Sequence, residues 1–389
     1  MRISPAGGLT WIVAAAAVGS LYAPALTGLS ARATTPVAAG IIAAGLVGLA
    51  LAEGSAFRAE APESIARRLS AACLALAVAL FAISQAAGAA SRPMNLNDWG
   101  LFALQAGTPI LLTVSGRRLA LLRAFGWTCL AFAAVDAVAN LAAFAHLIDL
   151  PAYAGRHVEG GVRLRYPGLS GATHAAGLVA FAAVTFVATG TGGRLRPALA
   201  ARLGLLAVLI ASLWLIDARR YVVLAILAVF LLGFRPAWRL PLAWIATGIG
   251  AAGVAAAFAE ADDLRWRLMA AGAARALAHP LLGIGAAWRD AGQLSPVFQS
   301  LQDAGVTESG LVDLSIAYGA LAAALLVLSA LAALAARRAR QSLPAVLLAL
   351  LTAELAFGDS LTGFLGALLF FAALTACQRD DAALYRTAP

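Results

Sequence analysis

Two stretches in the last third of the chain place polar side chains and glycines beside an apolar segment. The first runs from Ala278 to Gly285 and contains a Pro turn, and the second runs from Thr307 to Gly319. Glu308 in the second stretch could accept a proton from a hydroxyl group. It could equally be an N-cap or first-turn acid of the following helix, although Thr307 or Ser309 could cap that helix as well. A plain membrane anchor requires neither stretch, so we expect a functional site here.

Arginines form the second group of candidate functional residues. All 28 basic residues of the chain are Arg. A guanidinium presents a planar fork that suits phosphate oxygens and stays charged when partly desolvated. The alternative is that such side chains reach toward lipid headgroups. Only a very short polar turn separates two apolar spans before Arg220. For Arg220 we therefore favour a functional role over contact with lipid headgroups, with Asp217 as its ion-pair partner. The candidates on the outer face gather in three segments: Arg156, Arg163 and Arg165; Arg219 and Arg220; Arg265, Arg267, Arg275 and Arg289.

The elements that must position these groups are membrane helices. The 389 residues are 62% hydrophobic and 12% charged, with a mean hydropathy of +0.86, and runs of about 20 apolar residues match a bilayer. The sequence predicts an all-α polytopic membrane protein forming a single integral membrane domain over residues 1–389. The expected spans are 9–28, 36–54, 69–89, 98–115, 124–147, 171–191, 199–216, 220–234, 240–259, 309–335, 343–358 and 361–377.

The distribution of arginines predicts the orientation of the chain. A net charge of +9 would suggest nucleic acid as a partner of a soluble protein, but in a membrane protein it reports topology. More arginines fall in loops on the side of both termini, which predicts that both termini are cytoplasmic. The loops at 148–170 and 260–308 are then periplasmic, the second one partly helical. Cys73, Cys129 and Cys377 lie in apolar runs and form no disulfide or metal pattern, so we expect no metal and no cofactor.

Four stretches resemble the O-antigen ligase/polymerase family of bacterial membrane glycosyltransferases. Residues 165–174 resemble its R-x-x-G-x-x-G-N-P-N segment at the start of a span, with His174 in place of the last Asn. Residues 220–225 resemble its S-R-G-x-x-x-A helix start. Residues 265–285 resemble its Arg, amphipathic helix and hPL-x-G-x-G turn, and residues 308–319 its later helix start. In that helix start Glu308 and Ser309 replace a His-Asn pair of the ligases.

This resemblance implies a GT-C-like fold in the bacterial inner membrane and transfer of a glycan from undecaprenyl diphosphate to a hydroxyl acceptor, without metal. It implies Arg220 and Arg265 as catalytic groups at the diphosphate and Glu308 as the base. Arg165, Arg219, Arg267, His174 and His279 are the expected substrate-binding residues, although His279 also fits a simple turn residue. The acid at 308 favours an O-antigen or exopolysaccharide polymerase.

Two other readings stay open. A ligase would transfer the glycan to lipid A core or to a protein, and a polysaccharide or lipid transporter would use intramembrane acids such as Asp313, Glu354 and Asp359. Carriers keep their polar groups near the bilayer midplane, whereas this sequence concentrates them in residues 260–308. Membrane lipid, a glycan acceptor and a chain-length regulator are the expected partners, and nucleic acid is not.

Overall fold

The structure is a computed structural model of the chain. It describes residues 5–29, 31–53, 107–108, 111–112, 118–150, 153–158, 161–166, 168–189, 199–233, 263–283, 309–320, 342–355, 358 and 364–377, with isolated helical residues between 72 and 86, at 245 and between 322 and 331. The chain divides into two compact units. The first comprises residues 1–54, 117–239 and 384–389, and the second comprises residues 55–116 and 240–383.

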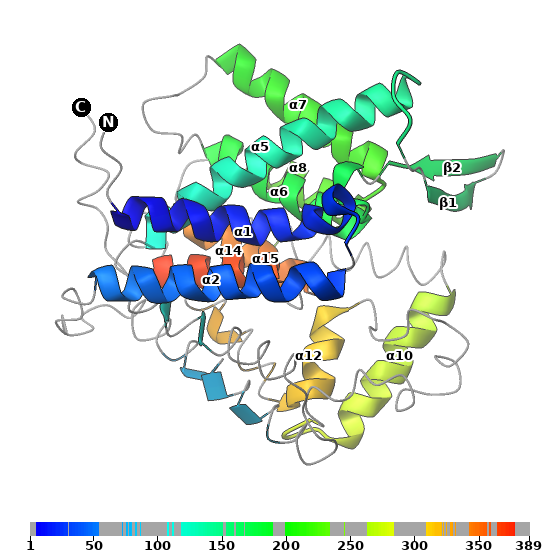
Figure 1. The fold of residues 1–389 in the computed structure, drawn as a ribbon. Helices are drawn as coiled ribbons and strands as arrows, with labels where there is room; N and C mark the ends of the chain where they lie inside the picture. Colours follow the sequence, from blue (N-terminus) through cyan, green and yellow to red (C-terminus); the bar gives the residue numbers. More distant parts are fainter. Residues whose placement is uncertain are drawn as a thin grey trace. The chain divides into compact units, whose positions relative to one another are not determined.

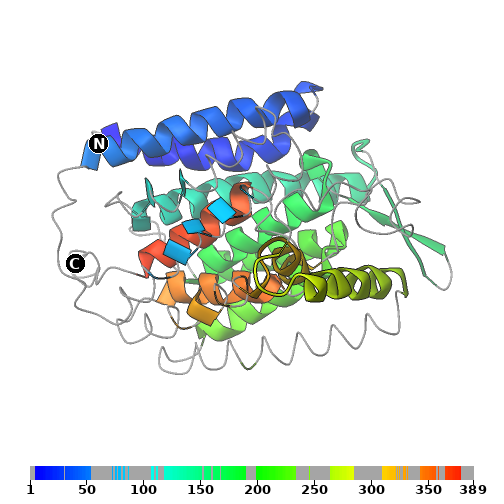
Figure 2. The same cartoon turned by 90° about the horizontal axis from the view of Figure 1, so that it is seen from below.

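The first unit is a bundle of apolar helices. Its described elements are α1 (Pro5–Thr27), α2 (Ala31–Glu53), α5 (Arg118–Phe144), the strands β1 (Tyr153–Val158) and β2 (Gly161–Arg165), the 3₁₀ turn η2 (Gly168–Ser170), α6 (Thr173–Thr189), α7 (Leu199–Ile216) and α8 (Arg219–Gly233). α6 packs against α5, α7 and α8, and α1 packs against α2 and α5. α1 and α2 lie side by side in both views (Figures 1 and 2).

Glycines set the close spacing of α1 and α2. A β-carbon at Gly45 would lie 2.5 Å from Cγ2 of Val13, and one at Gly48 would lie 3.1 Å from Cδ1 of Leu9. Small residues let helix backbones approach where lipid provides no hydrophobic drive for association. α1 ends at Thr27 and is followed by Gly28, whose φ of 68° suits a residue without a side chain and whose N–H donates to the carbonyl of Pro24.

The second unit contributes four described helices. They are α10 (Asp263–Ala278), α12 (Gly310–Tyr318), α14 (Ser342–Glu354) and α15 (Phe364–Ala376). α10 packs against α12, and α14 packs against α15. α10 lies in the segment 260–308, where a helix between apolar spans was expected.

The observed helices agree with the helical prediction, whereas the strands β1 and β2 depart from the predicted all-α fold. Nine of the predicted spans overlap one of the helices α1, α2, α5, α6, α7, α8, α12, α14 or α15. The predicted spans 69–89, 98–115 and 240–259 fall almost entirely outside the described residues. By length and composition three helices of the described part can cross a bilayer: Gly7–Thr27, Thr34–Ala52 and Leu119–Phe144. Shorter apolar helical segments are Thr173–Ala188, Ala201–Ile216, Arg220–Leu231, Leu343–Glu354 and Leu365–Ala376. A count of twelve spans therefore stays a prediction.

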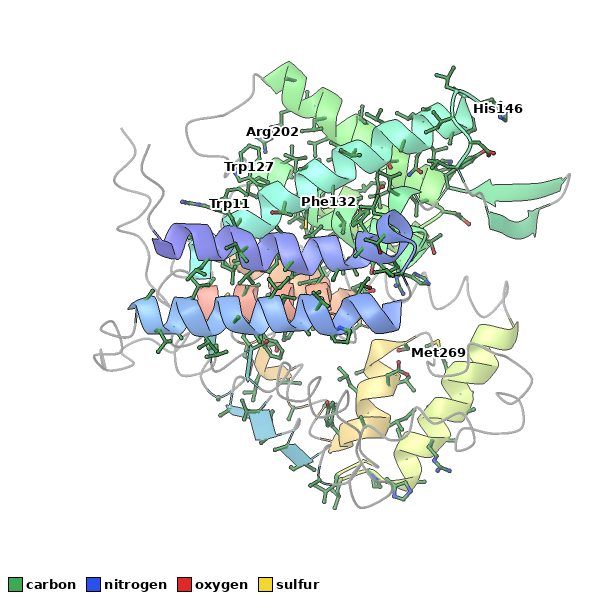
Figure 3. All side chains as sticks on the ribbon, viewed as in Figure 1. Trp11, Trp127, Phe132, His146, Arg202 and Met269 are labelled. Atoms are coloured by element: carbon green, nitrogen blue, oxygen red, sulfur yellow. The ribbon has the colours of Figure 1, made fainter. Side chains whose placement is uncertain are left out.

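The outer faces of these helices are apolar. Trp11 of α1 is 46% exposed, Val37 of α2 is 64% exposed and Val138 of α5 is 66% exposed, and Figure 3 labels Trp11. Exposed apolar patches of this extent mark surfaces that something other than water covers. Together with the length of the three spanning helices, they identify the chain as a membrane-associated protein.

A two-stranded ribbon occupies part of the predicted 148–170 loop. β1 and β2 pair antiparallel, with Tyr153 opposite Arg165 and Val158 opposite Gly161 and an irregularity between Ala154 and His157. The ribbon extends away from the helices of its unit (Figure 1). The sequence analysis predicted no strands here, because Gly and Arg interrupt the alternation of apolar and polar residues that marks a strand.

Candidate functional site

Two predicted site residues of the first unit meet at the N-terminal ends of α6 and α8. Nη2 of Arg220 lies 3.0 Å from Nδ1 of His174. A guanidinium only donates hydrogen bonds, so this hydrogen bond forms in the His174 tautomer whose Nδ1 accepts and whose Nε2 carries the proton. His174 is exposed and Arg220 is half-buried, so the pair can be reached from outside the helix bundle. His174 and Arg220 belong to two different sequence stretches, 46 residues apart.

Tyr221 and Gly177 fix the position of this pair. The guanidinium carbon of Arg220 lies 4.9 Å from the centroid of the Tyr221 ring, and Nη2 also donates to the Tyr221 hydroxyl at 3.4 Å. A cation over an aromatic face is stabilised by the ring quadrupole. Tyr221 is only 1% exposed and packs on Phe181, with ring centroids 6.1 Å apart. A β-carbon at Gly177 would overlap the Tyr221 ring, so glycine here lets α6 approach α8 closely.

The segment that leads into α6 lies at the same end of the first unit. The Tyr166 N–H donates to the carbonyl of Leu215 near the end of α7, at 3.2 Å, and its ring packs edge-on against Phe144 at the end of α5. α7 then passes to α8 through a tight turn in which Asp217 has a φ of 57°. Asp is one of the few residues with a side chain that adopts this conformation readily. Tyr166, seven residues before the start of α6, thus contacts the C-terminal ends of α5 and α7.

In the second unit, the two stretches with which the sequence analysis began contact each other through their backbones. The N–H of Ala320 donates to the carbonyl of Pro280 at 2.6 Å. Gly283 has a φ of 67°, and a β-carbon there would overlap the carbonyl of Ala317. Gly319 has a φ of 60°, and its β-carbon would lie 2.6 Å from the carbonyl carbon of Leu281. The Pro turn after α10 is therefore seated directly on the C-terminal end of α12.

Replacing either glycine with alanine is expected to destabilise the second unit. Overpacking of a close contact costs about 1–3 kcal/mol, and a side chain at a positive φ costs about 1–2 kcal/mol more. Gly283→Ala and Gly319→Ala should therefore lower the midpoint of thermal unfolding of the purified protein in detergent. Gly204→Ala is the matched control, because a β-carbon at Gly204 in α7 meets no atom within 4 Å. Equal midpoints for all three variants would contradict the close contact.

The start of α12 shows which residue caps this helix. Ser309 is the N-cap, and its side chain accepts a hydrogen bond from the N–H of Val312 at 3.4 Å. The next two N–H groups, of Gly310 and Leu311, donate to the carbonyls of Gly358 and Leu355 at 2.6 and 2.7 Å. The N-cap role is therefore filled by Ser309, and capping does not account for the acid at position 308.

The other predicted site residues are placed only in part. Glu308 lies outside the described residues. Backbone positions are described for Arg165 at the end of β2, Arg219 at the start of α8, and Arg265 and Arg267 in α10, whereas their side chains lie outside the described part. His279 is exposed in the turn after α10, and its carbonyl accepts from the N–H of Gly283 at 3.0 Å. Convergence of these residues on one cavity stays a prediction.

The first unit also contains a buried acid that was not predicted as a site residue. Asp136 in α5 is 2% exposed, accepts a hydrogen bond from the Tyr22 hydroxyl at 2.6 Å and another from the Leu169 N–H at 2.8 Å. One turn further along α5, Nδ2 of the fully buried Asn140 lies 3.4 Å from Oγ of Ser212. The position of Asp136 inside a predicted apolar span could have indicated this, because an acid there is costly unless it has a structural or functional partner.

Among the residues that the structure describes, no three His, Cys, Asp or Glu side chains are grouped so that they could hold a metal ion. No protein-family model matches the chain, and no curated protein is significantly similar to it. The function must therefore be argued from the site and from the chemistry of its residues.

Proposed function

We propose that the protein is an inner-membrane glycosyltransferase that polymerises undecaprenyl-diphosphate-linked oligosaccharide on the periplasmic face, by metal-independent inverting transfer. The growing glycan, an O-antigen or exopolysaccharide, is both donor and acceptor. The observation that carries this proposal is the Arg220–His174 pair, at 3.0 Å, held at the ends of two membrane helices. Each residue comes from a stretch that resembles the same family of enzymes.

The pair is suited to bind a diphosphate. His174 and the Tyr221 ring together fix one nitrogen and the plane of the Arg220 guanidinium before any substrate arrives. A preorganised cation is more effective than a mobile one, because it need not reorganise while charge develops on the leaving group. As the anomeric bond breaks, negative charge grows on the diphosphate, so Arg220 stabilises the transition state more than the bound substrate.

The remaining predicted residues complete the mechanism. Arg165, Arg219, Arg265 and Arg267 supply further donors to the diphosphate, and His279, exposed in the Pro turn, is a further substrate-binding residue. Glu308 deprotonates the acceptor hydroxyl, which attacks the anomeric carbon from the face opposite the diphosphate and inverts its configuration. The proton passes to Glu308, and the lipid diphosphate leaves with the bonding electron pair.

The topology follows from the same proposal and has its own test. Donor glycan is used on the periplasmic face, so residues 148–170 and 260–308 should be periplasmic and residues 116–123 and 336–342 cytoplasmic. Alkaline phosphatase fused within 260–308 is expected to be active, and the same reporter fused within 336–342 inactive. Active phosphatase in the second fusion and inactive phosphatase in the first would reject both the orientation and the periplasmic reaction.

The decisive experiment is a reaction with purified components. Protein in nanodiscs, given only undecaprenyl-diphosphate oligosaccharide, is expected to produce longer lipid-linked chains, resolved by gel electrophoresis and mass spectrometry. Unchanged donor alone, with glycan appearing on added lipid A core or protein, would identify a ligase instead. Donor that moves across proteoliposome membranes without covalent change would identify a transporter.

His174 offers a test of the pair itself. In the resembled family an Asn stands at this position, and an Asn amide oxygen can accept a hydrogen bond from Arg220 as the imidazole does. His174→Asn is therefore expected to keep most of the polymerising activity, whereas His174→Ala should lose it and His174→Lys should lose more, through charge repulsion. The measurement is the initial rate of chain extension. If Asn and Ala lost activity equally, hydrogen bonding to Arg220 would not be the role of His174.

A further inference from the structure

The buried Asp136 of α5 lies beside the segment that leads to His174. The turn η2 packs against α1, α5 and α6. Oδ1 of Asp136 accepts from the Leu169 N–H in this turn, and Oδ2 accepts from the Tyr22 hydroxyl of α1. The carboxylate therefore connects three elements that are distant in sequence at one buried point.

The contact is too close to be incidental. Gly168 has a φ of 66°, and a β-carbon there would lie 2.5 Å from Oδ1 of Asp136. Asp136 stands eight residues before Phe144, the end of α5, so the turn reaches about 12 Å below the helix end at 1.5 Å per residue. Irregular backbone at such depth is tolerated only where the protein satisfies its polar groups. Asp136 does this for Leu169.

The same turn continues directly into the candidate site. Ser170 is 7% exposed, and its Oγ accepts from the N–H of Ala172 at 3.2 Å. α6 begins at Thr173, so His174 follows Leu169 by five residues, and the N–H groups of Gly171 and Ala172 between them donate to the Gly168 carbonyl and to Oγ of Ser170. A shift of η2 would shift the first turn of α6 and, with it, the acceptor that holds Arg220.

We propose that Asp136 is a positioning residue: with Tyr22 it fixes η2 at depth and so sets the start of α6, where His174 orients Arg220. It touches no substrate and acts through the turn. The effect of Asp136 on catalysis rests on the proposed function, whereas the positioning itself can be measured without substrate.

The variants separate hydrogen bonding from burial. Asp136→Asn keeps an oxygen acceptor for Leu169 and can donate to the Tyr22 oxygen, so it should behave almost as wild type. Asp136→Leu fills the space but accepts nothing. Tyr22→Phe removes only the second partner, and Gly168→Ala pushes a methyl group against the carboxylate while leaving the acid in place.

Hydrogen–deuterium exchange in nanodiscs provides the readout that needs no glycan. Asp136→Leu and Gly168→Ala are expected to speed exchange in peptides covering residues 166–176, with α7 and α14 unchanged, whereas Asp136→Asn leaves these peptides protected. Unchanged exchange at 166–176 in both disruptive variants, or a loss of protection throughout the first unit, would overturn the positioning role. If Asp136→Leu does not accumulate in the membrane, Gly168→Ala and Tyr22→Phe decide the same question.

Kinetics then test the connection to the pair. A displaced catalytic group can cost about 10²-fold in rate, so Asp136→Leu should lower kcat by about that factor with little change in KM. Residues that act through one another are not additive. In a His174→Ala background, Asp136→Leu should therefore cost almost nothing further. Additive losses would overturn the proposal. A local exchange effect in a protein that extends no glycan would instead reject the proposed function and keep the positioning.

Discussion

Replacing Arg220 with alanine is expected to abolish glycan extension while the protein remains in the membrane at its normal level. Loss of one preorganised donor to a developing negative charge costs about 10²–10³-fold in kcat. Arg220 is half-buried over the Tyr221 ring, so some thermal stability will be lost as well, but its helix neighbours stay packed. Arg220→Lys should recover little activity, because an ammonium cannot reproduce the planar fork or the stacking on the ring. The measurement is the rate of chain extension, normalised to the amount of folded protein.

The matched control is Arg202→Ala. Arg202 is also an arginine of the first unit, but its Nη2 donates to the carbonyl of Ala188, near the C-terminal end of α6. Ala188 is 14 residues beyond His174, about 21 Å along the helix. Figure 3 labels Arg202 and also His146, which follows the end of α5; the two residues lie near opposite ends of this unit. The Arg202 variant should keep its activity. Full activity in Arg220→Ala would reject the diphosphate role, and equal losses in both variants would point to general destabilisation.

The fold could be predicted from the sequence to the extent that apolar periodicity and length determine it. α1, α2 and α5 are rich in apolar residues, although Pro24 and Pro36 lie inside α1 and α2, and their observed bounds differ from the predicted spans by at most six residues. The ribbon of β1 and β2 could not be predicted in this way. It contains Gly161 and several arginines, and its pairing depends on where α5 and α6 deliver the two ends of the loop.

The candidate site was accessible to sequence reasoning only as separate residues. Arg220 and His174 were each selected from a local pattern, but their contact also depends on Gly177, which lies outside both stretches and allows α6 and α8 to approach. Asp136 was missed because its partners, Tyr22 and Leu169, are 114 and 33 residues away. A hydrogen-bonded acid cannot be distinguished from an unfavourable one until its neighbours in space are known.

At the start of α12 the structure narrows an alternative that the sequence left open, namely whether Glu308 is an N-cap or a base. Glu308 could be read as an N-cap or as a base, since both roles place a carboxylate before an apolar helix. Ser309 fills the N-cap position, and the first N–H groups of α12 are satisfied by carbonyls at the end of α14 and just beyond it. The two readings of Glu308 now predict different outcomes for one substitution.

Glu308→Gln is expected to lower the rate of chain extension by about 10²–10⁴-fold, the usual contribution of a positioned general base. Glutamine keeps the length of the side chain and an acceptor oxygen, so binding of donor glycan and thermal stability should stay close to wild type. Ser309→Ala is the matched control, because it removes the N-cap, costs about 1 kcal/mol of stability and leaves the base in place. A Glu308→Gln variant with normal rates would show that Glu308 has a structural role. A Ser309→Ala variant as inactive as Glu308→Gln would show that the reaction requires an intact start of α12, and not proton transfer to Glu308.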